Sequence, residues 1–389
     1  MPRPKGSRNK MSDSEKVADK IDGAIENMDE SDDVIEYVDK DKLIPTGLTL
    51  LNLACTDTID GGAGMGKINT IPGSSSSGKT FLVYNMLAAI ANNPRFDEYE
   101  LIFDDVEHAS EFNISHLFGD KLKNRIISPR YDKNGIPINS NTIQEFKSNI
   151  LMKSNEGIKF IWVLDSLDAL STDEEIEKEY KEAVRDAKSP EHIKELKGSF
   201  NTEKAKILGQ ILRMIKKEVK NTDSSVNILQ QLRQKINAGP FEKKHATSGG
   251  EAPYFYSTHQ WWLSKKASHK DDIYKKVIGQ RTKLDVSKNK MTGKKRTIEF
   301  DIFDSFGIDN IGANIDFLLE NNIWKKAGKT IKAPEFDMDF TSNSDGKAKD
   351  QLIDYIENNN LEEDLDEIVG VSWSYIEDSM KLKRKKRFS

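Results

Sequence analysis

The sequence predicts an α/β protein with a mostly parallel central sheet, because three of its features are typical of that class. A glycine- and serine-rich loop stands between a short apolar run and a helical stretch. Further apolar runs alternate with helical stretches from residue 42 to about residue 324. Runs such as FIWVL at 160–164 are apolar at every position, as strands covered on both faces need to be.

The strands are expected at the apolar runs and the helices at the stretches with helical periodicity between them. Strands are predicted at 67–71, 99–105, 159–165, 226–231, 282–288 and 297–303. Helices are predicted at 80–92 and 142–153. The last two strands are joined through KNKMTGKK, which predicts a hairpin at the edge of the sheet.

The chain is expected to divide into three parts. Residues 1–41 hold a basic arm, a helix at 12–28 whose narrow apolar stripe needs a partner surface, and an acidic linker. Residues 42–330 form the α/β core, and residues 331–389 form a small helical unit with a basic tail. The N-terminal arm is either a solvated tail or a contact to a DNA minor groove. We hypothesise that the basic tail at the C-terminal end, residues 381–389, recruits duplex DNA.

Composition indicates a protein of the reducing cytoplasm. The net charge of −5 does not by itself point to nucleic acid, although positive charge gathers at both ends of the chain. The single cysteine, Cys55, excludes a disulfide within the chain. We expect no secretory signal and no membrane span, because no apolar run approaches 18 residues.

The loop GSSSSGKT matches the phosphate-binding pattern G-x-x-x-x-G-K-[ST] in full. Its backbone N–H groups and the following helix N-terminus favour an anion, the lysine reaches the β- and γ-phosphates, and the threonine hydroxyl ligates Mg²⁺. The cofactors expected are therefore ATP and Mg²⁺. Asp165 ends a buried strand and is assigned with Thr80 to the magnesium ion. The predicted ATP-binding residues are Gly73, Ser74, Ser75, Ser76, Ser77, Gly78, Lys79 and Thr80.

Further stretches narrow the class of nucleotide-binding protein. They are IPTGLTLLNLA, FDDVEHAS, ILQQLRQKI, ATSGGEAPYFYST and VSKNKMTGKKRTIEFDI. By these motifs and their order, the chain from about Leu43 to Lys325 resembles the bacterial RecA recombinase family. The resemblance implies a RecA-like ATPase that forms filaments on single-stranded DNA and exchanges homologous strands in recombination and repair. It also implies homologous duplex DNA as a partner, with single-strand-binding or mediator proteins as further candidates.

Two residues are expected to act at the γ-phosphate. We expect strand 99–105 to lie beside the phosphate-loop strand, so that Glu107 polarises the attacking water; the resemblance makes it the catalytic glutamate. Gln231 ends another strand, and the resemblance implies that it reports the state of the nucleotide to the DNA-binding loop. The alternatives are a helix-terminal acid and an ordinary strand-end amide. On the adenine side, Glu111 and Ile114 depart from the family's aspartate and aromatic residue.

Two loops are expected to bind DNA. The loop at 233–254 is too long for a routine connection. The charged segment at about 172–205 is a helical extension with DNA contacts, a partner site, or a segment ordered only on DNA. The predicted DNA-binding residues are Arg233, Lys235, Ile236, Lys243, Lys244, Ser248, Gly249 and Gly250.

Three residues are expected to act between subunits. Lys288 and Lys290 alternate, so on a strand both point to one face. The resemblance implies that they bind the γ-phosphate held by the next subunit and stabilise transition-state charge there. Phe255 matches a position that relays the nucleotide signal. The alternatives are a solvated basic face and a core aromatic.

Two other functions stay open. A hexameric helicase shares this fold, but such helicases typically use an arginine where this chain has lysines. A recombination mediator would bind ATP without exchanging strands. The sequence suggests a phage-encoded member, although a bacterial origin is the alternative.

Overall fold

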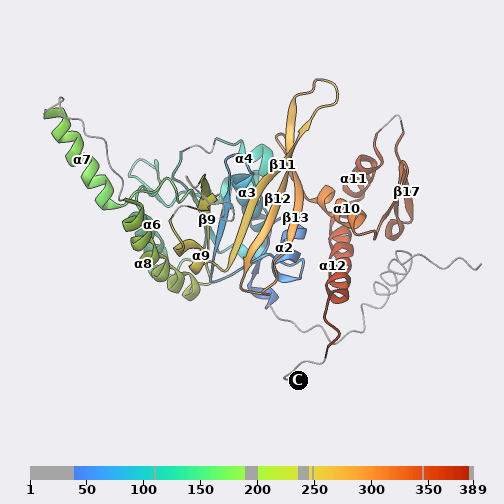
Figure 1. Ribbon diagram of the computed structural model, residues 1–389, viewed down its shortest axis with the longest axis horizontal. Helices are drawn as coiled ribbons and strands as arrows, with labels where there is room; N and C mark the ends of the chain where they lie inside the picture. The colour runs from blue at the N-terminus through green and yellow to red at the C-terminus, as the bar shows by residue number, and fades with distance from the viewer. Residues whose placement is uncertain are drawn as a thin grey trace, which may run out of the picture. The chain divides into compact units, whose positions relative to one another are not determined.

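The computed structural model describes residues 39–108, 111–188, 200–234, 245–247, 249–343 and 346–384. The predicted arm and helix at 1–38 therefore lie outside the described residues. The rest divides into two compact units, drawn in Figure 1: a larger one with residues 39–56 and 60–309, and a smaller one with 57–59 and 310–384.

The larger unit is built on a ten-stranded sheet in the order β14-β13-β12-β11-β3-β9-β8-β4-β5, with β10 paired to β9. Neighbouring strands from β11 to β5 are parallel, whereas β12, β13 and β14 add antiparallel strands at one edge. The predicted class, an α/β protein with a mostly parallel sheet, is thus confirmed. The strands are β3 (Lys67–Gly73), β4 (Glu100–Asp105), β5 (Ile126–Ile127), β8 (Phe160–Asp165), β9 (Ser225–Gln234), β10 (His245–Thr247), β11 (His259–Lys270), β12 (Val277–Asn289), β13 (Thr297–Phe303) and β14 (Gly307–Asp309).

One expectation about strand order is wrong. β4 does not lie beside the phosphate-loop strand β3, because β9 and β8 stand between them. β3 pairs with β9 along its whole length, from Lys67↔Ser225 to Gly73↔Gln231. The central positions next to β3 are therefore occupied by β9 and β8, which come later in the sequence. These strands are apolar enough to be covered on both faces.

The hairpin of β12 and β13 forms at the sheet edge as predicted, but a longer hairpin precedes it. β11, which the sequence does not reveal, pairs with β12 from His259↔Asn289 to Lys270↔Val277. Its second half is exposed and carries no apolar alternation. Because β3 ends opposite Leu263, the rest of this hairpin extends beyond β3, as Figure 1 shows.

Helices cover the sheet and build its core. α6 and α8 pack together, and Phe146, Trp162, Leu212 and Ile228 belong to one buried cluster. α3 packs against the sheet through Tyr84, whose ring stacks on Phe103 at 4.6 Å. The helices are α2 (Thr49–Thr56), α3 (Lys79–Asn92), α4 (Ile114–Phe118), α5 (Asp120–Arg125), α6 (Ile143–Asn155), α7 (Asp173–Lys188), α8 (Phe200–Asn221) and α9 (Ala252–Tyr256). Short elements are η2 (Lys40–Lys42), η3 (Pro94–Phe96), and the paired strands β1 (Leu43–Ile44) with β2 (Ala63–Gly64) and β6 (Arg130–Tyr131) with β7 (Pro137–Ile138).

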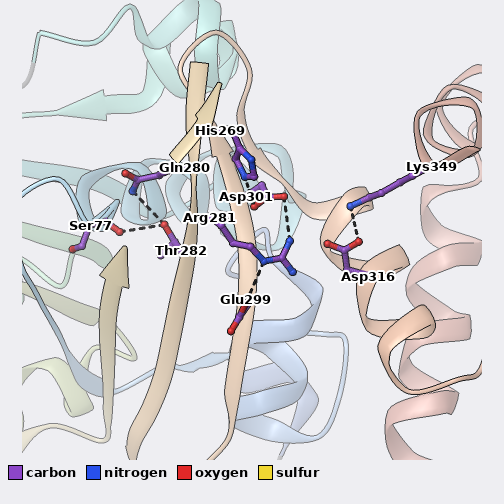
Figure 2. A network of polar contacts seen from close by, with 9 residues as sticks. All are labelled: Ser77, His269, Gln280, Arg281, Thr282, Glu299, Asp301, Asp316 and Lys349. Carbon is purple, nitrogen blue, oxygen red and sulfur yellow. Dashed lines mark hydrogen bonds and ion pairs between the residues drawn. The ribbon is translucent and has the colours of Figure 1, made fainter. Parts of the chain in front are cut away.

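The smaller unit begins at residue 310, earlier than the boundary expected after residue 330. The reason is that α10 packs with α11 and α12, and Lys349 pairs with Asp316 of α10 at 2.7 Å (Figure 2). This unit also contains a three-stranded sheet that the sequence analysis does not predict. Its elements are α10 (Asn310–Glu320), β15 (Lys325–Ala327), β16 (Thr330–Ala333), η5 (Pro334–Phe336), β17 (Met338–Thr341), α11 (Ala348–Asn359) and α12 (Glu362–Ser379). Among the described residues of the whole chain, no helix has the length and apolar character of a membrane span.

Candidate active site

The phosphate loop joins β3 to α3 and curls back on itself. Ser77 N–H donates to Ser74 O at 3.2 Å, and Gly78 has a φ of +94°. A Cβ on Gly78 would lie 2.4 Å from Ile302 Cδ1, so the position also needs a residue without a side chain. β12 supports the loop from behind, because Thr282 Oγ1 donates to Ser77 O at 3.4 Å (Figure 2).

Lys79 lies folded against this loop. Its Nζ donates to Gly73 O and to Ser74 O, each at 2.9 Å. Burial lowers the pKa of Lys79, and the nearby carboxylates Asp165 and Glu107 oppose that shift. The loop therefore holds a positive charge beneath exposed backbone, which suits a phosphate chain.

Asp165 meets Thr80 at the end of β8. Thr80 Oγ1 donates to Asp165 Oδ2 at 2.9 Å. Burial raises the pKa of Asp165 to about 6, the hydrogen bond from Thr80 lowers it, and the charge of Glu107 raises it further. A hydroxyl and a carboxylate are oxygen ligands of the kind Mg²⁺ prefers.

The donor set fits magnesium better than a metal held by protein alone. Within the described residues no group of three or more His, Cys, Asp or Glu side chains gathers as a metal site. Mg²⁺ is usually held by one or two protein oxygens plus substrate phosphates and water, and Thr80 with Asp165 meets that pattern.

Glu107 reaches the same site although its strand lies three places away from β3. The turn after β4 packs on β8, because Val106 N–H donates to Asp165 O at 2.8 Å. Gln231 Nε2 donates to Glu107 Oε1 at 2.8 Å, and Ser166 Oγ donates to the same oxygen. Side chains at the carboxyl ends of four adjacent parallel strands, β3, β9, β8 and β4, thus converge.

Two members of this cluster are not among the predicted site residues. Ser166 holds Glu107, and Asp168 Oδ2 accepts a hydrogen bond of 2.7 Å from Gln231 N–H. Both follow Asp165 closely in the chain, and this adjacency is the signal that points to them. They fix the positions of Glu107 and of the end of β9.

Lys288 and Lys290 form a separate group with α9. Lys288 Nζ donates to Tyr254 O and, at 3.2 Å, to Phe255 O, and Lys290 Nζ donates to Phe255 O at 3.3 Å. The two lysines therefore share a face. Burial, together with the charges of Lys290 and Lys216, lowers the pKa of Lys288 to about 8. Phe255 is 67% exposed, so it is not a core aromatic within this chain.

The lysine group and the phosphate loop lie toward opposite ends of β3. Asn289 pairs with His259, and His259 pairs with Asn69 in the first half of β3. Asn69 and Gly73 are four steps apart in β3, a distance of about 13 Å along the strand. Sequence alternation predicts that the two lysines share a face, but only the strand register shows toward which end of β3 they lie.

The predicted DNA-binding loop is described in part. β10 pairs antiparallel with the end of β9, with Thr247 opposite Leu232, so the chain leaves and returns side by side. Gly249 has a φ of +78°, and a Cβ there would lie 2.5 Å from Leu208 Cδ2, which shows close packing against α8. Gly250 is exposed. The side chain of Arg233 and the residues Lys235, Ile236, Lys243, Lys244 and Ser248 lie outside what the structure describes.

The residues compared with the family on the adenine side, Glu111 and Ile114, follow β4 in the chain. Glu111 is exposed, and Ile114 begins α4. Between them, Phe112 packs edge-on against Phe81 in the first turn of α3, with ring centroids 4.9 Å apart. An aromatic side chain that the sequence analysis does not single out therefore lies next to the phosphate-loop helix.

Comparison with known proteins gives a consistent match. The family model described as the RecA N-terminal domain matches residues 19–309. Protein RecA of Streptomyces coelicolor is 30% identical over 287 residues, which are 74% of this chain and 67% of that protein. Protein RecA of Syntrophobacter fumaroxidans is 29% identical over 287 residues, 74% of this chain and 73% of that protein. Protein RecA of Chloroherpeton thalassium is 29% identical over 269 residues, 69% of this chain and 66% of that protein.

Proposed function

Because this chain belongs to the RecA family, we propose that it is a DNA-dependent ATPase that assembles on single-stranded DNA and exchanges homologous strands. The observation that carries the proposal is the cluster of Thr80, Asp165, Glu107 and Gln231 at the phosphate loop. It joins an ATP-hydrolysing site to the strand that leads directly into the predicted DNA-binding loop. The proposed setting is the cytoplasm of a bacterium or of a phage-infected host.

The residues divide the work of hydrolysis. Thr80 and Asp165 would hold Mg²⁺, which would neutralise charge on the γ-phosphoryl group of bound ATP. The phosphate loop and Lys79 hold the phosphate chain. Glu107 Oε1 accepts hydrogen bonds from Ser166 and Gln231, which fixes the carboxylate and directs Oε2 to take a proton from the attacking water.

Gln231 couples this chemistry to DNA. Its amide nitrogen donates to Glu107 at 2.8 Å, and a γ-phosphate oxygen would be a further acceptor for the same NH₂ group. Its backbone is held by Asp168, and Arg233 follows two residues later in the same strand. A change of hydrogen-bond partner at Gln231 would therefore shift the start of the β9–β10 hairpin.

The lysines act on a second copy of the chain. Both amines donate to Phe255 O of α9, and the register of β11 places them toward the amino end of β3, away from the phosphate loop at its carboxyl end. Lys288 and Lys290 are therefore proposed to bind a triphosphate held by a neighbouring subunit, where they stabilise transition-state charge. Exposed Phe255 lies beside them and would contact the same neighbour.

Strand exchange between circular single-stranded DNA and homologous linear duplex DNA tests the proposal. Joint molecules are expected with ATP and absent without it. If ATP hydrolysis persists but no joint molecules form, the proposed strand exchange is wrong and the chain is better described as a recombination mediator. Unwinding of a forked duplex would instead favour a helicase.

A further inference from the structure

A third lysine, Lys216, lies close to the pair formed by Lys288 and Lys290. It belongs to α8, and two contacts of that helix, one on either side of Lys216 in the sequence, locate it. A Cβ on Gly209 would lie 3.6 Å from Ala252 Cβ, at the start of α9. About three turns further on, a Cβ on Gly66 would lie 3.3 Å from Lys220 Cα, beside the start of β3. Lys216 lies between these points in α8, the helix that packs on both α9 and β3.

The backbone joins the same corner to Lys290. Thr258 N–H donates to Ile68 O at 2.7 Å, and Lys290 N–H donates to Thr258 O at 3.1 Å. Lys67, the first residue of β3, is therefore next to this junction. Four lysines thus surround the turn between α9 and β11: Lys67, Lys216, Lys288 and Lys290.

Within the described residues, none of the four lysines forms an ion pair with a carboxylate. Burial and then the charges of Lys290 and Lys67 lower the pKa of Lys216, and Lys216 in turn lowers that of Lys288. Cations that repel one another at a partly buried site indicate an anionic ligand.

We propose that Lys216 is a third cation of the site that Lys288 and Lys290 form for the triphosphate bound by a second copy of this chain. The inference rests on the proposed action of these two lysines between subunits. A nucleoside triphosphate with several negative charges matches a cluster of this size. Lys216 belongs to α8, which packs on α9 at the end of the predicted DNA-binding loop. It would therefore connect the neighbour's nucleotide to the helices that flank this loop.

The matched pair Lys216→Gln and Lys217→Gln tests this inference. Lys217 is exposed and points away, one residue along the same helix. Assembly without DNA is measured by sedimentation velocity at increasing protein concentration, with Mg²⁺ and a slowly hydrolysed ATP analogue. Loss of one charge-assisted contact should raise the concentration for half-assembly roughly tenfold in Lys216→Gln. Lys217→Gln should behave as the native chain, and Lys216→Arg should restore assembly.

A mixing experiment checks that Lys216 acts on the neighbour. Lys79→Ala lacks its own nucleotide but keeps Lys216, whereas Lys216→Gln keeps its nucleotide. At a protein concentration too low for Lys216→Gln to assemble, the two variants mixed together should hydrolyse more ATP than the sum of the two alone; no gain over that sum would contradict action on the neighbour. Native-like thermal unfolding of Lys216→Gln and unchanged binding of a fluorescent ATP analogue by its monomer would exclude misfolding.

The outcomes separate this inference from the proposed function. If Lys288→Ala with Lys290→Ala prevents assembly while Lys216→Gln matches Lys217→Gln, the inference fails and the proposed function stands. If the double variant also assembles normally, the action between subunits fails as well. If Lys216→Gln weakens binding of single-stranded DNA without nucleotide and leaves assembly intact, the ligand is a DNA backbone and the inference is overturned.

Discussion

Replacing Glu107 with glutamine should stop ATP turnover and leave nucleotide binding intact. The change is nearly isosteric and removes only the charge and the proton-accepting power of the side chain. Glutamine keeps an Oε1 atom, which can still accept the hydrogen bonds from Gln231 and Ser166. The side chain should therefore stay in place while its chemistry is lost.

The expected magnitudes follow from these contacts. A positioned general base contributes about 10²- to 10⁴-fold in rate, which corresponds to about 3–5 kcal/mol of activation free energy. A hydrogen bond to a charged group is worth about 1.5–3 kcal/mol and one to a neutral group about 1 kcal/mol, so folding stability should fall slightly. Removal of the repulsion that Glu107 exerts on Asp165 offsets part of that loss, and the net change should stay within about 1 kcal/mol.

Three measurements give a decisive test. Phosphate release with single-stranded DNA reports turnover, titration with an ATP analogue reports binding, and urea unfolding reports stability. Glu111→Gln is the matched control, because Glu111 is exposed in the same loop. Turnover within about threefold of the native rate would remove Glu107 from the catalytic role. A parallel loss of analogue binding would mean that its role is structural.

Three further predictions concern single positions. Gly78→Ala places a Cβ 2.4 Å from Ile302 Cδ1 at a φ of +94°, so urea unfolding should show a loss of about 1–2 kcal/mol and calorimetry a loss of ATP affinity; native behaviour in both would contradict this. Lys288, whose pKa is lowered to about 8, attracts an anion only when protonated, so analogue-driven assembly should weaken as the pH rises through about 8. Lys288→Arg should remove that decline, and an identical decline would exclude Lys288 as its cause. Burial raises the folded-state pKa of Asp104 to about 6 from 3.8, so its contribution to stability is fully present below about pH 4 and is lost as the pH rises through 6. Asp104→Asn should flatten urea-unfolding stability between pH 4 and 7, and an unchanged slope would refute the assignment.

The parts of the site that local chemistry defines could be predicted from the sequence. The phosphate loop and Asp165 are recognised because each sits at the end of an apolar strand, and the parallel sheet brings such ends together. The order of the strands is not a local property. It depends on which strand pairs with which, and β9 and β8 take the places next to β3 that β4 is expected to occupy.

Side-chain contacts formed between distant segments could not be predicted either. Glu107 and Gln231 are 124 positions apart, and only the folded sheet brings Gln231 Nε2 within 2.8 Å of the carboxylate. Lys216 shows no motif at all, since it is one of several lysines on a charged helix. Its place beside Lys290 depends on how α8 packs on α9 and β3.

The positions of the phosphate loop and of the lysines Lys288 and Lys290 limit the kinds of assembly expected of this chain. The phosphate loop lies at the carboxyl end of β3, and Lys288 and Lys290 lie toward its amino end. An interface in which the lysines of one subunit contact the phosphate loop of the next joins two different surfaces and is therefore head-to-tail. Such interfaces produce closed rings or open helical filaments. Electron microscopy with an ATP analogue and single-stranded DNA should therefore show open helical filaments, and Lys288→Ala with Lys290→Ala should abolish them. Closed six-membered rings would favour the helicase, and symmetric dimers would contradict the head-to-tail arrangement altogether.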